Sequence, residues 1–187
     1  MISRRNIFLV WLIVQVTVLG GWASQHEWQR QHAPRVLLKL APVDPYDLVR
    51  GRYQRISFDI ENVPTSVVQQ SAVCKDDLKY HETPVWLVLK KGSHEWYEVD
   101  SIHREFPADK EFVVRSTYSG PWSHWDSKTN KHSQMGLQVS MGIDRYFIPA
   151  GHYDLPRGTN HVVCGEVSVT RSGTPQLERL MIDGKPY

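Results

Sequence analysis

A long apolar run near the start of the chain is its most regular pattern. The run extends from Ile7 to Ala23, follows the cationic pair Arg4 and Arg5, and gives way to a sharply polar segment. As a helix it would be roughly 25 Å long, near the lower limit for crossing the apolar layer of a membrane. Cationic residues before such a segment tend to stay in the cytoplasm. We therefore predict a signal-anchor helix over residues 1–24, with the chain after it on the outer side.

A cleaved secretory signal is the alternative interpretation of this run. Gly21 and Ala23 place small residues three and one before a potential cleavage point, but the bulky Trp22 between them and the long apolar region suit that role poorly. A buried core helix fits less well, because the segment is apolar on every side. After the anchor we predict a juxtamembrane stalk over residues 25–34, which Pro34 ends.

The rest of the chain is dominated by the period-two alternation of β-strands. Between Tyr53 and Ile60, the apolar residues Ile56, Phe58 and Ile60 fall on one face and the polar residues on the other. Further strands are predicted over residues 35–43, 85–90, 96–103, 111–118, 137–141, 145–148, 161–170 and 177–182.

The segments between these strands carry turn chemistry. Lys91–His94 and Arg171–Gly173 are short enough to close hairpins. Residues 65–80 are ambiguous and could hold a short helix, whereas residues 119–134 are rich in Gly, Pro, Ser, Asn and Lys and are predicted as a loop. Many short strands with Gly and Pro turns indicate a mainly β protein: a single β-rich sandwich or small-barrel domain over residues 35–187, after an N-terminal transmembrane helix.

Charge and length limit the classes of function. The formal net charge of the 187 residues is +2, which is too balanced to indicate a nucleic-acid partner. About 160 residues after the anchor suit one domain. The two cysteines, Cys74 and Cys164, could form a disulfide in an oxidising compartment and would close a loop of about 90 residues, but spacing alone leaves two free thiols equally open.

One loop concentrates residues that could bind a metal or a partner. His124, Asp126 and His132 could bind zinc or copper, but no spacing typical of a metal site accompanies them. We therefore predict no metal and no cofactor. The nearby Tyr118, Trp122 and Trp125 could form an exposed aromatic surface, although such side chains more often pack in a core or a loop.

A motif follows the first predicted strand. The sequence VDPYDLVRGRYQRISF contains Gly51 and Tyr53, then Ile56 and Phe58. It resembles the defining segment of the bacterial GDYXXLXY family, in which Gly-Asp-Tyr is followed by two residues, Leu, one residue and Tyr. Ile56 and Phe58 replace the Leu and Tyr with similar shapes. Arg52 replaces the Asp, which reverses its charge.

A second motif lies near residue 150. The sequence RYFIPAG, which starts at Arg145, resembles the family's Arg-Tyr-Phe-Ile-Pro-Glu-Gly, with Ala150 in place of Glu. The resemblance covers most of the chain in the family's order, and it implies an N-terminally anchored protein that faces the periplasm. It implies no activity. If the two family carboxylates were catalytic or metal-binding, this chain has lost both.

The motifs are therefore better explained as structure than as chemistry. A glycine suits a left-handed turn at residue 51, and Ile56, Phe58 and Phe147 are expected to share one core. The positions that we expect to be structural are Gly51, Tyr53, Ile56, Phe58, Arg145, Tyr146, Phe147, Pro149 and Gly151. The competing interpretation is a cleft in which Arg52 and Arg145 recognise an anionic ligand.

These patterns leave two hypotheses for function. The first is a non-enzymatic β-domain held at the inner, cytoplasmic membrane by a single pass, with its N-terminus inside and its C-terminal domain in the periplasm, binding another envelope membrane protein. The second is an envelope hydrolase or metal-dependent enzyme. A pocket that brings His, Asp and Glu together from separate strands would favour the second.

Overall fold

The protein consists of a long helix and a β-rich domain. The computed structural model describes residues 4–41, 53–71, 82–126, 131–147 and 161–187. The chain divides into two compact units, Met1–Ala33 and Pro34–Tyr187. Each unit is described by itself below.

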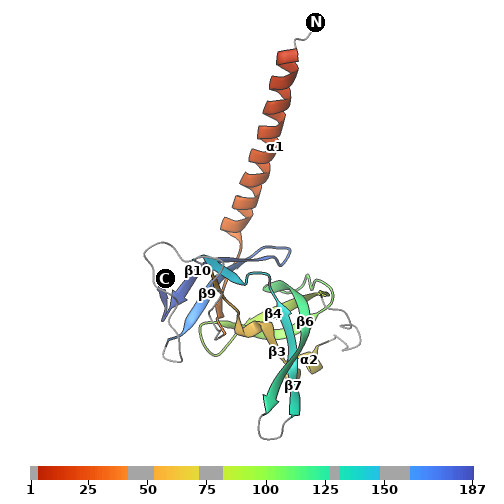
Figure 1. Ribbon diagram of the computed structural model, residues 1–187, viewed down its shortest axis with the longest axis vertical. Helices are drawn as coiled ribbons and strands as arrows, with labels where there is room; N and C mark the ends of the chain where they lie inside the picture. Colours follow the sequence, from red (N-terminus) through yellow and green to blue (C-terminus); the bar gives the residue numbers. More distant parts are fainter. Residues whose placement is uncertain (1–3, 42–52, 72–81, 127–130, 148–160) are drawn as a thin grey trace. The chain divides into compact units, whose positions relative to one another are not determined.

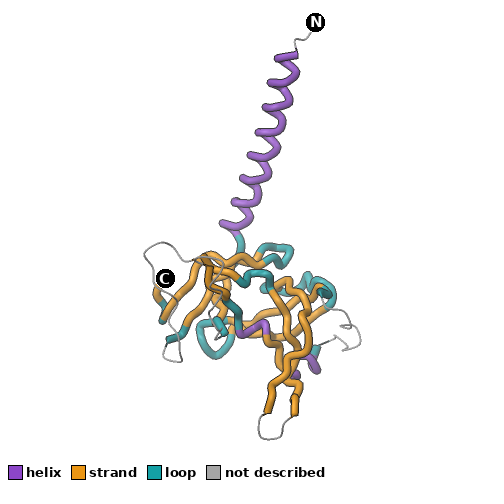
Figure 2. Tube along the Cα trace, viewed as in Figure 1, coloured by secondary structure: helices purple, strands orange, loops and turns teal. Residues whose placement is uncertain are grey.

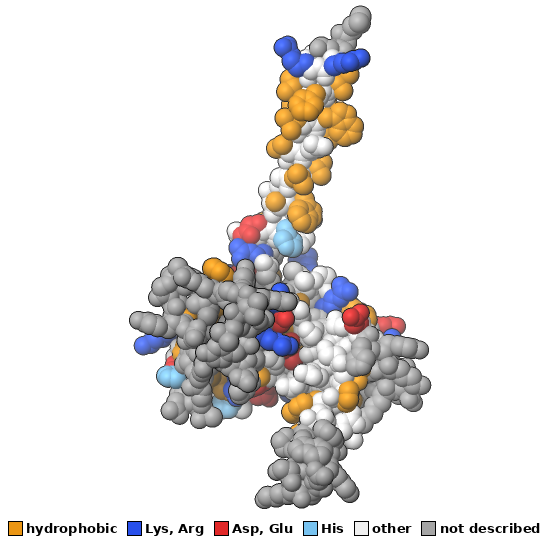
Figure 3. Space-filling model, in the orientation of Figure 1, with side chains coloured by type: hydrophobic (Ala, Val, Ile, Leu, Met, Phe, Trp, Pro, Cys, Tyr) orange, Lys and Arg blue, Asp and Glu red, His pale blue; other side chains and the backbone are white. Residues whose placement is uncertain are grey.

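The first unit is the helix α1 (Arg4–His32), which has no buried residue. Its most apolar 18-residue window has a mean hydropathy of 1.9, so α1 is long and apolar enough to cross a membrane. Figure 3 shows apolar side chains along its length and cationic ones at its N-terminal end. The helix continues through the predicted stalk and ends two residues before Pro34, whose ring cannot continue a helix.

The second unit contains a four-stranded antiparallel sheet built from both ends of the domain. The order is β1–β9–β10–β11, and β1 is therefore an edge strand. Its members are β1 (Arg35–Lys39), β9 (Val163–Val169), β10 (Pro175–Ile182) and β11 (Lys185–Pro186). The turn between β9 and β10 is the one that the sequence predicts at Arg171–Gly173.

A five-stranded antiparallel sheet forms the middle of the chain, in the order β3–β7–β6–β4–β5. Its members are β3 (Asn62–Pro64), β4 (Pro84–Lys91), β5 (Tyr97–His103), β6 (Val113–Asp126) and β7 (Lys131–Ser140). The remaining elements are a ribbon of β2 (Tyr53–Arg55) with β8 (Arg145–Phe147), the 3-10 turn η1 (Asp59–Glu61) and the short helix α2 (Thr65–Gln70). Figure 2 shows how little of this unit is helical.

Both sheets contribute to one hydrophobic core. Val36, Val167 and Leu180 from the four-stranded sheet and Leu87 and Ile102 from the five-stranded sheet belong to a single buried cluster. The turn between β9 and β10 also contacts β6, where the Arg115 N–H donates to the Gly173 carbonyl at 2.7 Å. The prediction of a mainly β domain after an N-terminal helix is confirmed.

The predicted loop over residues 119–134 is wrong. β6 continues to Asp126 and β7 begins at Lys131, so most of this segment is a long hairpin (Figure 1). Beyond Tyr118, β6 pairs only with β7 among the residues that the structure describes. No further strand lies there among the described residues to accept the N–H that Pro121 lacks. Ser119 and Ser123 are exposed, so these positions do not require apolar side chains. Turn-forming residues are tolerated there because the hairpin extends past the core.

The predicted strand over residues 53–60 is interrupted. Its backbone leaves β2 after Arg55, makes an isolated bridge between Phe58 and Leu40, and then forms η1. The alternation is nevertheless kept, since Ile56, Phe58 and Ile60 are all buried.

Candidate functional site

A buried carboxylate organises the segment that follows the first motif. Glu61, only 9% exposed, accepts hydrogen bonds from the Ser57 hydroxyl at 2.8 Å and the Phe58 N–H at 3.0 Å through one oxygen. Its other oxygen accepts from the Met141 N–H at 3.1 Å, just after β7. A carboxylate with three donors fastens η1 to the end of β7. Glu61 therefore has a structural role.

Phe58, the last residue of the first motif, belongs to the hydrophobic core. It is fully buried. Its ring lies against Gly165 of β9, where an added Cβ would come within 2.8 Å of the Phe58 Cε1 atom and 3.0 Å of the Leu177 Cδ1 atom. The aromatic ring thus needs a residue without a side chain beneath it.

The two sequence motifs are strand partners. In the β2–β8 ribbon, Tyr53 pairs with Phe147 and Arg55 with Arg145, and the Ile56 N–H donates to the Asp144 carbonyl at 2.9 Å. The register joins segments that are about 90 residues apart. It explains why one chain carries both motifs without requiring any shared chemistry.

The expectation that Phe147 joins Ile56 and Phe58 in the core is wrong. Phe147 is 54% exposed, whereas Tyr146 packs against the core and its ring lies 6.3 Å from that of Tyr187. The side chains of β8 alternate between the two faces, but the one that faces the core is Tyr146 in the middle of the strand.

Several other predicted site residues lie outside the part of the chain that the structure describes. They are Gly51, Arg52, Cys74, Pro149 and Gly151. The paired recognition of an anion by Arg52 and Arg145 and the Cys74–Cys164 disulfide therefore stay predictions. Cys164 itself is buried on β9, and this burial raises the pKa of its thiol.

The residues considered for a metal or an aromatic surface are spread over the β6–β7 hairpin. His124 is opposite Ser133, and His132 is opposite Trp125, so the two histidines belong to different cross-strand pairs. Tyr118 is buried in the core. Among the described residues, no three His, Cys, Asp or Glu side chains are grouped as a metal would require.

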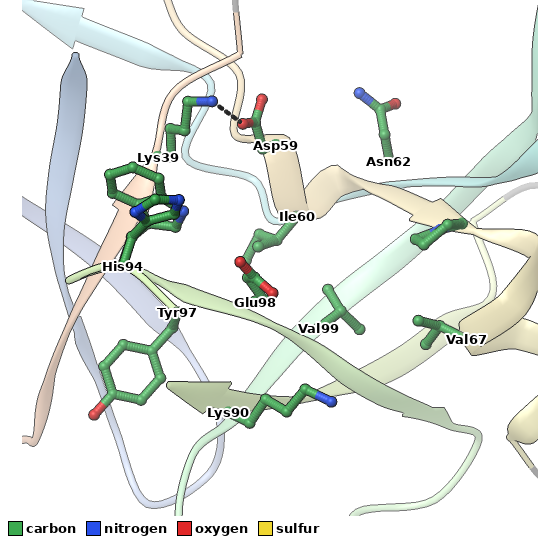
Figure 4. A pocket seen from close by; sticks show the side chains of 12 residues that line it. Lys39, Asp59, Ile60, Asn62, Val67, Lys90, His94, Tyr97, Glu98 and Val99 are labelled. Atoms are coloured by element: carbon green, nitrogen blue, oxygen red, sulfur yellow. Dashed lines mark ion pairs between the residues drawn. The ribbon is translucent and has the colours of Figure 1, made fainter. Parts of the chain in front are cut away.

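A pocket of about 540 Å³ lies beside β5 and was not foreseen from the sequence (Figure 4). Ile60 and Val99 lie in the middle of the view, between the Lys39–Asp59 pair and Lys90. The pocket is also lined by α2 through Val67. It thus gathers residues from β1, η1, β3, α2, β4 and β5.

The two lysines that line this pocket are paired with carboxylates. Lys39 Nζ is 3.3 Å from an Asp59 carboxylate oxygen and 5.6 Å from the centre of the Trp96 ring. Lys90 also lines the pocket; its Nζ is 2.8 Å from an Asp100 carboxylate oxygen, and this hydrogen bond raises the pKa of Lys90. His94 stacks on Trp96 with ring centres 4.4 Å apart. The pocket therefore combines two paired lysines, the carboxylate of Glu98 and an apolar part formed by Ile60, Val67 and Val99.

The sequence did not reveal the pocket because its residues come from six separate elements. The role of Glu61 had a local signal in the sequence. An acid three residues after Phe58 can accept a hydrogen bond from the start of a helical turn.

These features define a class of protein: an N-terminal apolar helix joined to a single β-domain whose two signature segments pair with each other. The sequence profile described as "GDYXXLXY protein" matches residues 15–180, and the chain belongs to this family. No curated protein is significantly similar to the chain, and no solved structure is either.

Proposed function

We propose that this chain is a single-pass protein of the cytoplasmic membrane whose β-domain lies in the periplasm and binds another envelope membrane protein. The observation that carries the proposal is α1, an apolar helix with no buried residue and no place in the core of the β-domain. Arg4 and Arg5 before the apolar run favour an N-terminus that stays inside.

Binding is favoured over catalysis by the kind of residues that the domain brings together. The family motifs build a strand ribbon and a core contact. The charged groups Lys39 and Lys90 at the pocket are engaged by Asp59 and Asp100, so neither is poised as an acid or base. The alternative, an envelope hydrolase or metal-dependent enzyme, needs convergent acids, bases or nucleophiles. No such constellation supports it among the described residues.

The length of the connection also supports a membrane partner. Only Ala33 and Pro34 separate α1 from β1. At about 3.5 Å per extended residue, this link is too short for the domain to reach far from its anchor. A partner that is itself in the membrane would be within reach.

Protease accessibility tests the orientation. Protease added to spheroplasts should digest the region after Trp28, whereas a cytoplasmic marker protein should remain intact. Complete protection of the β-domain in spheroplasts, with digestion after lysis, would contradict the proposed orientation.

Co-purification tests the function itself. The full chain carrying a C-terminal tag is crosslinked in cells, solubilised in mild detergent and purified, and the bound proteins are identified. The control is α1 with the same tag on an unrelated periplasmic domain. A membrane protein enriched only with the native β-domain is the expected result, and equal enrichment with both would count against the proposal.

A further inference from the structure

The pocket lies beside an edge strand whose main chain is open. β5 is the last strand of its sheet and pairs only with β4 among the described strands. β1 is the edge of the other sheet, and Lys39 at its end lies over Trp96, just before β5. The edge of β5 therefore borders the pocket from Tyr97 to Val99.

The strand register shows which main-chain groups face outward. The Leu89 N–H donates to the Phe112 carbonyl at 2.9 Å, away from β5, and Leu89 is opposite Val99. In an antiparallel pair, residues at such a position turn their N–H and C=O away from each other. Val99 thus presents both groups to the outer side of β5.

The same rule explains a contact further along β5. Leu87 is opposite Ile102, and the outward Ile102 N–H is satisfied by the Ser71 hydroxyl at 3.0 Å. Within the described ranges, Val99 has no corresponding partner. One end of the edge is therefore capped by the residue after α2, while the end at the pocket is open.

We propose that the pocket binds an extended peptide segment of the partner protein, which adds as a strand to β5 and places an apolar side chain between Ile60, Val67 and Val99. This inference rests on the proposed function and names the kind of contact that it uses. The main-chain groups supply hydrogen bonds, and the apolar middle accepts every second side chain of the segment. A small anion fits poorly, because Lys39 and Lys90 are already paired with carboxylates.

A defined peptide probe tests this inference. A display library of random linear peptides is selected on the full chain in lipid nanodiscs, and the enriched peptide is synthesised for affinity measurements. N-methylation of one set of alternate amides should lower the affinity at least about tenfold, because only alternate residues of an added strand face β5, whereas the complementary set should leave it nearly unchanged.

Two variants of the protein connect the peptide to the pocket. Val67→Glu places a charge among the apolar lining residues and should lower the affinity at least about tenfold. Val162→Glu is the matched control, since Val162 is 40% exposed and does not line the pocket. Both variants should keep the circular dichroism spectrum and melting temperature of the native chain within a few degrees.

Three results would overturn the inference. They are the absence of any peptide enriched over empty nanodiscs, equal effects of the two N-methylated sets, and an affinity that Val67→Glu does not change. A disulfide crosslink between two Glu98→Cys copies would show that a second copy of this chain, and not a segment of the partner, pairs with β5. If Val67→Glu still co-purifies with the membrane partner, the proposed function stands and the pocket is not its contact.

Discussion

Glu61 is the residue whose burial has the largest consequence for the fold. A buried carboxylate is stable only when its oxygens accept hydrogen bonds, and Glu61 accepts three, two of them from the main chain. These bonds connect Phe58, the last residue of the first motif, with Met141, just after β7. The side chain therefore replaces a strand pairing where the backbone bends into η1.

Glu61→Gln should destabilise the domain by about 1–3 kcal/mol. The NH2 group of the new glutamine would face at least one of the donors that now bond to Glu61, and that donor would lose its acceptor. The melting temperature should fall by roughly 2–4 °C for each kcal/mol in a domain of this size. Glu105→Gln, an exposed acid, is the control and should change stability by less than about 0.5 kcal/mol. Equal melting temperatures for the two variants would contradict a structural role for Glu61.

Gly165→Ala should destabilise the domain by about 1–3 kcal/mol, since the new methyl group would press on the Phe58 ring and on Leu177. The diagnostic measurement is a double-mutant cycle by urea denaturation. In a Phe58→Leu background the smaller side chain leaves room, so the cost of Gly165→Ala should decrease. Additive effects would show that the two positions do not share the contact.

At the scale of elements, the ribbon of β2 and β8 accounts for the two motifs together. The register sets Arg55 directly opposite Arg145, and both side chains are exposed, so water weakens their repulsion. Tyr146, and not Phe147, packs inward. Alternation in the sequence predicts that one face of such a short strand is buried, but a three-residue strand with aromatic residues at adjacent positions does not show which face.

The elements that the sequence predicted well are those that cover the core. The pairs β4–β5 and β9–β10 are apolar strand segments on either side of short turns, and both were found close to their predicted bounds. The ends of the β6–β7 hairpin were missed because they extend past the core, so that nothing selects apolar residues there. The break after β2 was missed because the burial of Ile56, Phe58 and Ile60 continues through a change of backbone.

The turn between β10 and β11 gives a prediction about pH. The Asp183 carboxylate bonds His161 at 2.7 Å and accepts from the Val162 N–H at 2.9 Å; these contacts, the His161 bond first, hold its pKa below the ordinary value of 3.8. A lowered pKa stabilises the fold at pH values above 3.8, and this contribution is lost as the pH falls through the folded-state pKa.

Asp183→Asn keeps an acceptor for Val162 and tolerates the positive φ of 49° at this position, but it cannot carry the charge. The native chain should therefore have the higher urea midpoint near neutral pH, and the two midpoints should converge well below pH 3.8. A difference in midpoint that stays constant over this range would mean that the charge of Asp183 does not contribute.

For the whole molecule, the division into a long apolar helix and a β-rich domain could be predicted from the sequence, whereas the pocket could not. The apolar run and the polar residues after it are local patterns. The pocket depends on how β1, η1 and α2 meet the edge of β5, which is decided by tertiary packing of residues that are distant in the chain. The same limit applies to Glu61, whose partner Met141 lies 80 positions away.

The last prediction concerns the independence of the two units. The hydrophobic core lies entirely within Pro34–Tyr187, and no residue of α1 is buried. A chain that begins at Pro34 should therefore fold on its own, with a melting temperature within a few degrees of that of the full chain in detergent, because no core contact is lost. It should also lose the membrane association that we propose for α1. Fractionation with carbonate washing measures the association, and near-ultraviolet circular dichroism measures the packing of the aromatic side chains. Loss of the near-ultraviolet signal in the shortened chain would show that α1 contributes to the fold, and membrane binding without α1 would show that the β-domain carries a second attachment.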